Sequence, residues 1–201
     1  DPFKPKLTKD APFYTSQGKN INVQTMVNEE GYTQFAADND VQVLRLNYRG
    51  GLSMIIFLPT KKDGISTFEK TFTKDKVSDL LSILSLREIK IFLPKFKFAS
   101  SFSLYRNLRA MGMRSAFNTG ADFSGMSEKQ ELFINDIIHD TYVDVDEKGT
   151  EAVAATTVRM FAGASDPGNN IFRADHPFLF LIRENNTGTI LFMGRITDPT
   201  K

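Results

Sequence analysis

The sequence contains no cysteine, no tryptophan and only two histidines, and these absences exclude several classes of function. Without cysteine, neither a disulfide, nor a thiolate metal site, nor a cysteine nucleophile can form. The two histidines, His139 and His176, are accompanied by no Gly-x-Ser-x-Gly elbow and by no glycine-rich phosphate loop. We therefore do not expect an enzyme.

Long runs of like charge or of apolar residues are also missing. The formal net charge is +1, and no Lys/Arg run is long enough to form an electrostatic patch, which argues against a nucleic-acid partner. The longest wholly apolar runs, such as 54–58 and 178–182, are far shorter than a membrane span of about 20 residues. No signal peptide is visible. With 41% hydrophobic and 24% charged residues, the composition is that of a soluble globular protein.

One acidic segment imitates the start of a calcium-binding loop. Asp144, Asp146, Lys148 and Gly149 follow the spacing of such a loop, but a lysine occupies a ligand position. The twelfth position is Ala155, where a bidentate glutamate is required. We reject a calcium site, and we expect neither a metal nor a cofactor.

Hydrophobic periodicity predicts a mixture of strands and helices. Residues 1–20 contain three prolines and a glycine and are predicted to be irregular. The predicted strands are 21–27, 88–98 (broken at Pro94) and 132–145, with hairpins over 41–58 and over 178–196, and the predicted helices are 63–86 and 103–111. The fold class is therefore α+β.

The segment after Gly149 changes character halfway along. Residues 150–158 are almost all small or β-branched, and at period two Thr150, Ala152, Ala154, Thr156 and Val158 form an uncharged face, with Glu151 on the other face. Residues 162–170 instead have the composition of an exposed loop. An Ala/Thr-rich linker, or a short helix starting near Thr150, is the alternative; β-branched residues at 156–158 weaken the helix.

Five separate motifs resemble those of one family, the serpins, and occur in the family's order. The segment Glu147-Lys-Gly-Thr-Glu-Ala-Val-Ala-Ala-Thr156 resembles the hinge of the serpin reactive loop. The other four are Phe92-Leu-Pro-Lys-Phe, Phe117-Asn-Thr-Gly-Ala-Asp-Phe-Ser-Gly, His176-Pro-Phe-Leu-Phe-Leu-Ile and Leu191-Phe-Met-Gly-Arg-Ile-Thr-Asp-Pro. The resemblance covers the whole chain.

The resemblance implies a serpin fold, α+β with mixed, mostly antiparallel sheets and a few helices. Residues 1–201 would be the carboxy-terminal portion of a single serpin domain, whose amino-terminal half is absent and would be a binding partner. The reactive loop would cover about 146–171, with a hinge comprising Glu147, Lys148, Gly149, Thr150, Glu151, Ala152, Val153, Ala154, Ala155 and Thr156. His139 would match the histidine beneath the opening of the main sheet. From the residues alone, we expect it to be a hydrogen-bonded structural histidine.

The function implied is inhibition of a serine protease by a suicide-substrate mechanism. The loop is cleaved, its first part inserts into the main sheet as a strand, and the acyl-bound protease is trapped, as the family is known to do. Inhibitory members keep bulky, charged and proline residues out of the hinge, and 152–157 contains none. The alternative is a non-inhibitory serpin that acts as a binding or chaperone-like protein.

The reactive bond follows from the family's usual spacing. The residue before the cut lies sixteen positions beyond the hinge glutamate, which gives Gly163–Ala164. Small side chains there suit an elastase- or subtilisin-like protease, while Phe161, Ala162 and Arg159 are alternative reactive-site residues. The compartment stays open; the sequon Asn185-Asn186-Thr187 favours a secreted protein, where it can be used.

Overall fold

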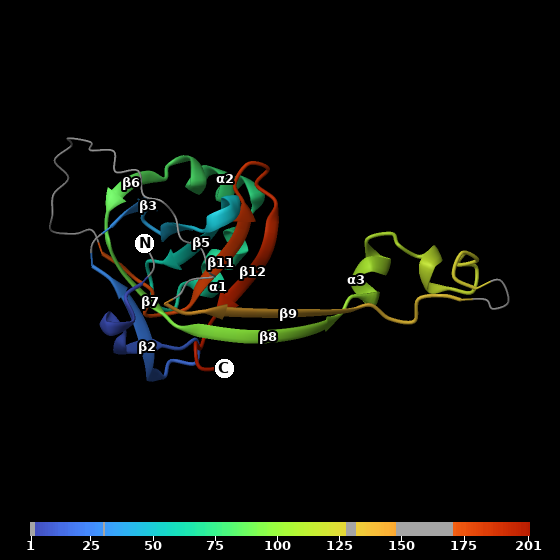
Figure 1. Cartoon of the computed structure of the whole chain (residues 1–201), viewed down its shortest axis with the longest axis horizontal. Coiled ribbons are helices and arrows are strands. Elements are labelled where there is room, and N and C mark those ends of the chain that lie inside the picture. The colour runs from blue at the N-terminus through green and yellow to red at the C-terminus, as the bar shows by residue number, and fades with distance from the viewer. Residues whose placement is uncertain (1–2, 30, 128–131, 148–170) are drawn as a thin grey trace. The chain divides into compact units, whose positions relative to one another are not determined.

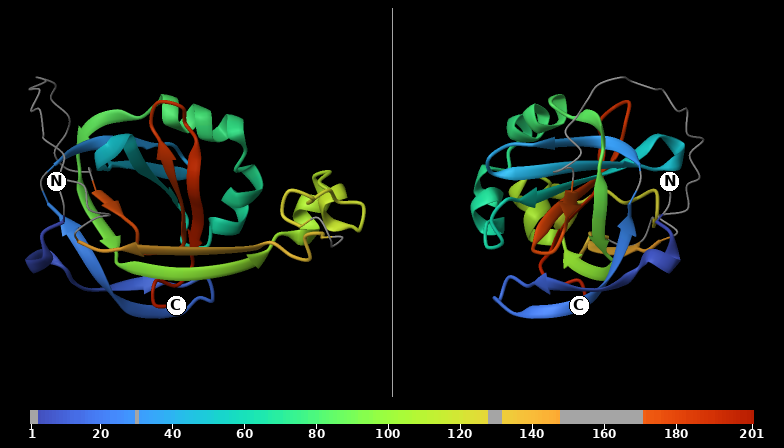
Figure 2. Two further views of the ribbon diagram at one scale, coloured as in Figure 1. Left: turned by 45° about the vertical axis from the view of Figure 1, so that its right-hand side comes forward. Right: turned by 90° about the vertical axis from the view of Figure 1, so that its left-hand side faces the viewer.

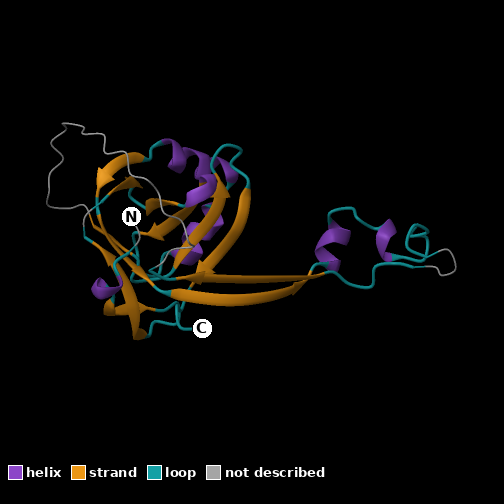
Figure 3. Ribbon diagram, in the orientation of Figure 1, coloured by secondary structure: helices purple, strands orange, loops and turns teal. Residues whose placement is uncertain are grey.

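The computed structural model describes residues 3–29, 31–127, 132–147 and 171–201. The chain divides into two compact units, Asp1–Lys97 with Asp144–Lys201, and Phe98–Val143. Figure 1 labels their elements, and Figure 3 colours the same elements as helices, strands and loops. Within the described ranges no helix is long and apolar enough to cross a membrane. The strand predicted over 150–158 lies outside the described residues, as does the hinge from Lys148 onward.

The first unit contains a six-stranded antiparallel sheet in the order β12-β11-β5-β4-β3-β6. Its strands are β3 (Tyr32–Ala37), β4 (Val41–Asn47), β5 (Leu52–Pro59), β6 (Ser85–Glu88), β11 (Phe178–Glu184) and β12 (Ile190–Ile196). Both predicted hairpins are confirmed: β4 pairs with β5 and β11 with β12. The β4–β5 connection, η2 (Arg49–Gly51), places two glycines at positive φ, 74° and 76°, a conformation that side chains disfavour.

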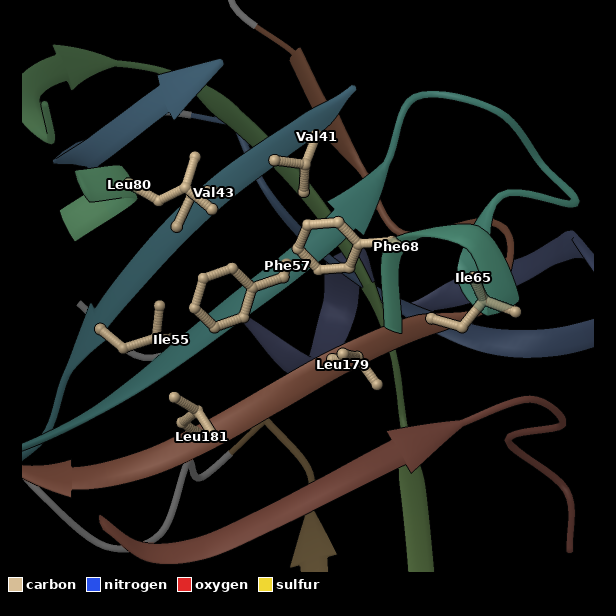
Figure 4. Packing of buried hydrophobic residues seen from close by; sticks show 9 residues of the cluster. All are labelled: Val41, Val43, Ile55, Phe57, Ile65, Phe68, Leu80, Leu179 and Leu181. Atoms are coloured by element: carbon tan, nitrogen blue, oxygen red, sulfur yellow. The ribbon is translucent and has the colours of Figure 1, made fainter. Parts of the chain in front are cut away.

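Two short helices cover one face of this sheet, α1 (Ile65–Thr71) and α2 (Lys74–Ser82). The single helix predicted over 63–86 is therefore wrong: the chain breaks at Phe72–Thr73, and the Thr73 hydroxyl accepts from Lys76 N to cap α2. Figure 4 shows the resulting core cluster, to which each helix and three strands contribute: Val41, Val43, Ile55, Phe57, Ile65, Phe68, Leu80, Leu179 and Leu181. Full burial of each large side chain contributes about 1.5–3 kcal/mol.

A second, four-stranded sheet of the same unit has the order β1-β2-β7-β10. Its strands are β1 (Lys9–Tyr14), β2 (Asn20–Asn28), β7 (Lys90–Pro94) and β10 (Ile171–Arg173), and β10 runs parallel to β7. The prediction that residues 1–20 are irregular is wrong, because β1 forms despite Pro12, preceded by the short η1 (Pro5–Leu7). Proline is tolerated there because β1 is an edge strand.

The second unit is built on the two-stranded sheet of β8 (Phe96–Ser103) and β9 (Ile138–Val145), which Figure 2 shows side by side. Residues 96–97 of β8 and 144–145 of β9 belong to the first unit. Between these strands lie α3 (Tyr105–Ala110) and η3 (Ser115–Phe117). The helix predicted over 103–111 is confirmed, while the strand predicted over 132–145 begins only at Ile138. Phe117 packs edge-on against Tyr105, with ring centroids 5.0 Å apart.

Candidate functional site: the two anchors of the loop

Glu147, the first residue of the predicted hinge, is anchored by two hydrogen bonds. It follows β9 after a single intervening residue, and its side chain is only 12% exposed. Its Oε1 accepts from Thr8 Oγ1 and its Oε2 accepts from Lys95 Nζ, each at 2.8 Å. Lys95 lies between β7 and β8, and its backbone nitrogen donates to Gln24 O at 2.8 Å. One carboxylate thus joins three segments that are far apart in the sequence.

The electrostatics of this anchor favour the ion pair. The hydrogen bond from Lys95 is the main cause that holds the pKa of Glu147 below its ordinary value, with Thr8 adding to it against partial burial. In turn the hydrogen bond to Glu147 raises the pKa of Lys95, and the charges of Asp146 and Asp144 act in the same direction. Both groups are therefore charged at neutral pH, and the end of β9 is held in one place.

β9 leads into this anchor as an edge strand. Among the described residues its sheet contains only β8 and β9, so one side of β9 has no strand partner there. Val143 and Val145 are buried, while the residues between and before them are more exposed, a one-sided pattern. Glu147 therefore follows a strand that is an edge strand among the described residues.

The chain returns from the undescribed segment in β10, which is firmly packed. Phe172 is fully buried and meets Phe35 edge-on at 6.5 Å between ring centroids. The Arg173 guanidinium lies 3.6 Å from the centroid of the Phe92 ring, a cation–π contact, and Ala174 N donates to Phe92 O at 2.9 Å. Residues 171–174 are thus fixed to β7, the strand directly before Lys95.

His176 adds a second tie just after β10. It is buried, with its Nε2 2.6 Å from Pro59 O and its Nδ1 2.7 Å from Asp175 Oδ1. Both partners are acceptors, so both contacts are hydrogen bonds when each ring nitrogen carries a proton. Asp175 is partly buried, which opposes its ionisation, but the hydrogen bond and charge of His176 hold the pKa of its carboxyl below the ordinary value. His176 thereby fastens the β10–β11 connection to the end of β5.

Of the remaining predicted site residues, the structure describes His139 and leaves the others outside its described ranges. Lys148–Thr156, Arg159, and Phe161, Ala162, Gly163 and Ala164 lie outside the described residues, so the hinge beyond Glu147 and the reactive bond stay predictions. His139 is exposed on β9, and within the described residues no hydrogen bond to its ring is found, so its structural role also stays a prediction. No group of three or more metal-ligating side chains occurs in the part of the chain that is described.

Sequence reasoning missed Thr8, Lys95 and the burial of His176. Lys95 lies inside the motif Phe92-Leu-Pro-Lys-Phe, which was a usable signal, although its partner could not be read from the motif. Thr8 carries no local signal, because its role depends on a residue 139 positions away.

The chain belongs to the serpin family. The sequence model of the family, described as serpin (serine protease inhibitor), matches residues 1–199. Three sheets and a few helices in the described part of the chain are consistent with that assignment, and the predicted α+β serpin fold is confirmed.

Several relatives are similar over nearly the whole chain. Serpin B3 of Homo sapiens is 38% identical over 98% of this chain and 52% of its own length. The leukocyte elastase inhibitor of Equus caballus is 38% identical over 98% of this chain and 54% of its own length. Among solved structures, uncleaved ovalbumin matches with a TM-score of 0.82 at 28% identity, over 99% of this chain and 50% of that chain. The chain therefore spans about half the length of these relatives.

Proposed function

We propose that this chain is the carboxy-terminal part of an inhibitory serpin, which acts on a serine protease as a suicide substrate. The observation that carries the proposal is the anchored Glu147, which lies two residues beyond the end of β9, an edge strand among the described residues. The strand-competent segment 150–158 follows directly, and Gly149 gives the chain the backbone freedom to turn. This segment can then pair with the edge from which it emerges.

The composition of the segment suits central insertion into a sheet. A strand buried on both faces must not carry a charge inward, and the face of Thr150, Ala152, Ala154, Thr156 and Val158 has none. Extended at about 3.3 Å per residue, 148–160 reaches about 43 Å. That length is sufficient to carry a bound protease along a domain.

The target class is proposed from the reactive bond. Cleavage at Gly163–Ala164 presents small side chains to the protease, which suits elastase- or subtilisin-like enzymes with shallow or occluded primary pockets. The similarity to the leukocyte elastase inhibitor supports the same class. Phe161 would instead suit a chymotrypsin-like pocket. Arg159 would be cut by trypsin after too short a stretch for full displacement of the protease.

The test is to incubate the full-length protein with elastase, subtilisin, chymotrypsin and trypsin, each in turn. We expect elastase or subtilisin to form a complex that survives denaturant, and mass analysis to find a released peptide that starts at Ala164. A peptide starting at Met160 in a stable trypsin complex would contradict the assigned bond. Cleavage without any complex, and with no gain in thermal stability of the cleaved protein, would favour a non-inhibitory serpin.

A further inference from the structure

Two arginines meet on the covered face of the six-stranded sheet, just beyond the core cluster. In the strand register Arg45 of β4 lies opposite Ile55 of β5, and Arg183 of β11 lies opposite Ser53, two residues along the same strand. Because alternate residues of a strand share a face, both arginines lie on the face of Ile55. They are therefore diagonal neighbours across β5.

The polar groups around these arginines do not neutralise them. Arg45 Nη2 donates to Asn185 Oδ1 at 2.8 Å, and Ser53 Oγ donates to the same oxygen at 2.7 Å. Within the described residues neither arginine makes an ion pair, and the Nε atoms of both are buried without a hydrogen-bond partner. A buried donor without a partner is unfavourable, because it has lost its hydrogen bonds to water.

The hairpin that follows β11 leaves room for the Arg183 side chain. Gly188 has a φ of 74°, and a Cβ at this position would lie only 2.8 Å from Arg183 Nη2. A larger residue would push the guanidinium aside, so the glycine leaves the space that Arg183 occupies. The nearby Glu184 is committed elsewhere: its carboxylate accepts from the backbone nitrogens of Asn186 and Thr187 at 2.9 and 2.6 Å. These bonds lower the pKa of Glu184 to about 2.

The positive charges of Arg45 and Arg183 repel each other unless an anion lies between them. Partial burial, and then the positive charge of Arg183, lower the pKa of Arg45. The planar guanidinium fork matches the oxygens of an oxyanion, and an anion between two arginines would satisfy unpaired donors and offset the repulsion.

We propose that Arg45 and Arg183 form a binding site for a small oxyanion of the sulfate or phosphate class. The supporting geometry is a pair of adjacent, partly buried arginines with unpartnered Nε atoms, one held by Asn185 and the other accommodated by Gly188. Asn185 also begins the sequon noted above, so this asparagine has a structural role independent of any glycan.

The test compares the thermal midpoint of the full-length protein in sodium sulfate, and separately in phosphate, with that in sodium chloride at equal ionic strength. We expect a saturating rise on the order of 2 °C, because a ligand that binds only the folded state stabilises it. Sulfate also stabilises proteins generally by exclusion from their surface, but that effect does not saturate and is shared by all variants.

Three variants distinguish anion binding at the two arginines from the general stabilisation by sulfate. Arg183→Gln should lose the saturating response, whereas Arg49→Gln, which changes an exposed arginine of the β4–β5 hairpin, should keep it. Arg45→Glu should also lose it while melting at a higher temperature than wild type in chloride, because it replaces repulsion by an ion pair with Arg183. A response shared by all four proteins, or no saturating response in wild type, would overturn the proposal. No saturating response in wild type is the result expected if another part of the full-length protein supplies a carboxylate to Arg45 and Arg183.

Discussion

Reversing the charge of Glu147 tests whether this residue anchors the start of the loop. In the wild type its carboxylate accepts from Lys95 Nζ and Thr8 Oγ1 at 2.8 Å each. The Glu147→Lys variant loses both hydrogen bonds and places a second ammonium beside Lys95. We expect a less stable protein whose loop is detached at its amino-terminal end.

The size of the effect follows from the geometry of the pair. At 2.8 Å, two unit charges attract by about 1.5 kcal/mol even in bulk water. The Lys95 side chain is 37% exposed, which moves the value toward the range of about 0.2–1 kcal/mol measured for surface pairs. Glu147 is only 12% exposed and its carboxylate is oriented by Thr8, and both features increase the coupling energy. We expect a coupling energy of about 1 kcal/mol.

A double-mutant cycle in the full-length protein measures this coupling. Glu147→Lys and Lys95→Glu are made singly and together, and the thermal midpoint of each is followed by circular dichroism at one scan rate. Each single variant should melt below wild type, and the charge-swapped double variant should recover on the order of 2 °C relative to the sum of the single effects. Strictly additive midpoints would refute the claim that the two residues act as a pair.

The pH dependence of the coupling has a defined sign. Glu147 has a lowered pKa in the folded state, so its contribution is complete above its ordinary pKa of about 4.3 and is lost as the pH falls through the folded value. Lys95 has a raised pKa, so its contribution is complete below about 10.4 and is lost as the pH rises through the folded value. The coupling should therefore be constant between about pH 5 and 10.

Three further predictions concern the hinge, the second anchor and the chain alone. Thr150→Arg should be cut at the same bond without forming a stable protease complex, because insertion would bury an unpaired guanidinium at a cost of several kcal/mol; normal complex formation on a denaturing gel would show that Thr150 is not on the inserted face. His176→Ala should cost about 1–3 kcal/mol, read from denaturant midpoints, because it leaves the Pro59 carbonyl and the Asp175 carboxylate without their partner; an unchanged midpoint would contradict this. Residues 1–201 expressed alone should aggregate, because apolar side chains of β8, β9 and β12 are exposed, and co-expression with the preceding half should restore solubility; a monomeric fragment with a cooperative melt would oppose this expectation.

Local patterns in the sequence were sufficient to predict the family, the fold class and several elements. The hairpins β4–β5 and β11–β12 and the helix α3 are encoded by periodicity and by turn residues that act over a few positions. The prediction that Glu147 begins the hinge also came from a local motif. These features are predictable because the residues that determine them are neighbours along the chain.

Only the tertiary structure decided the partners of those residues. Pro12 argued against a strand, yet pairing with β2 at a sheet edge forms β1. His176 carries no local signal of burial, because its partner is the carbonyl of Pro59, 117 positions away. Glu147 meets Thr8 and Lys95, and Arg45 meets Arg183, because strands remote in sequence are adjacent in a sheet or in space. Such contacts arise from sheet order and register, and no local propensity specifies either of them.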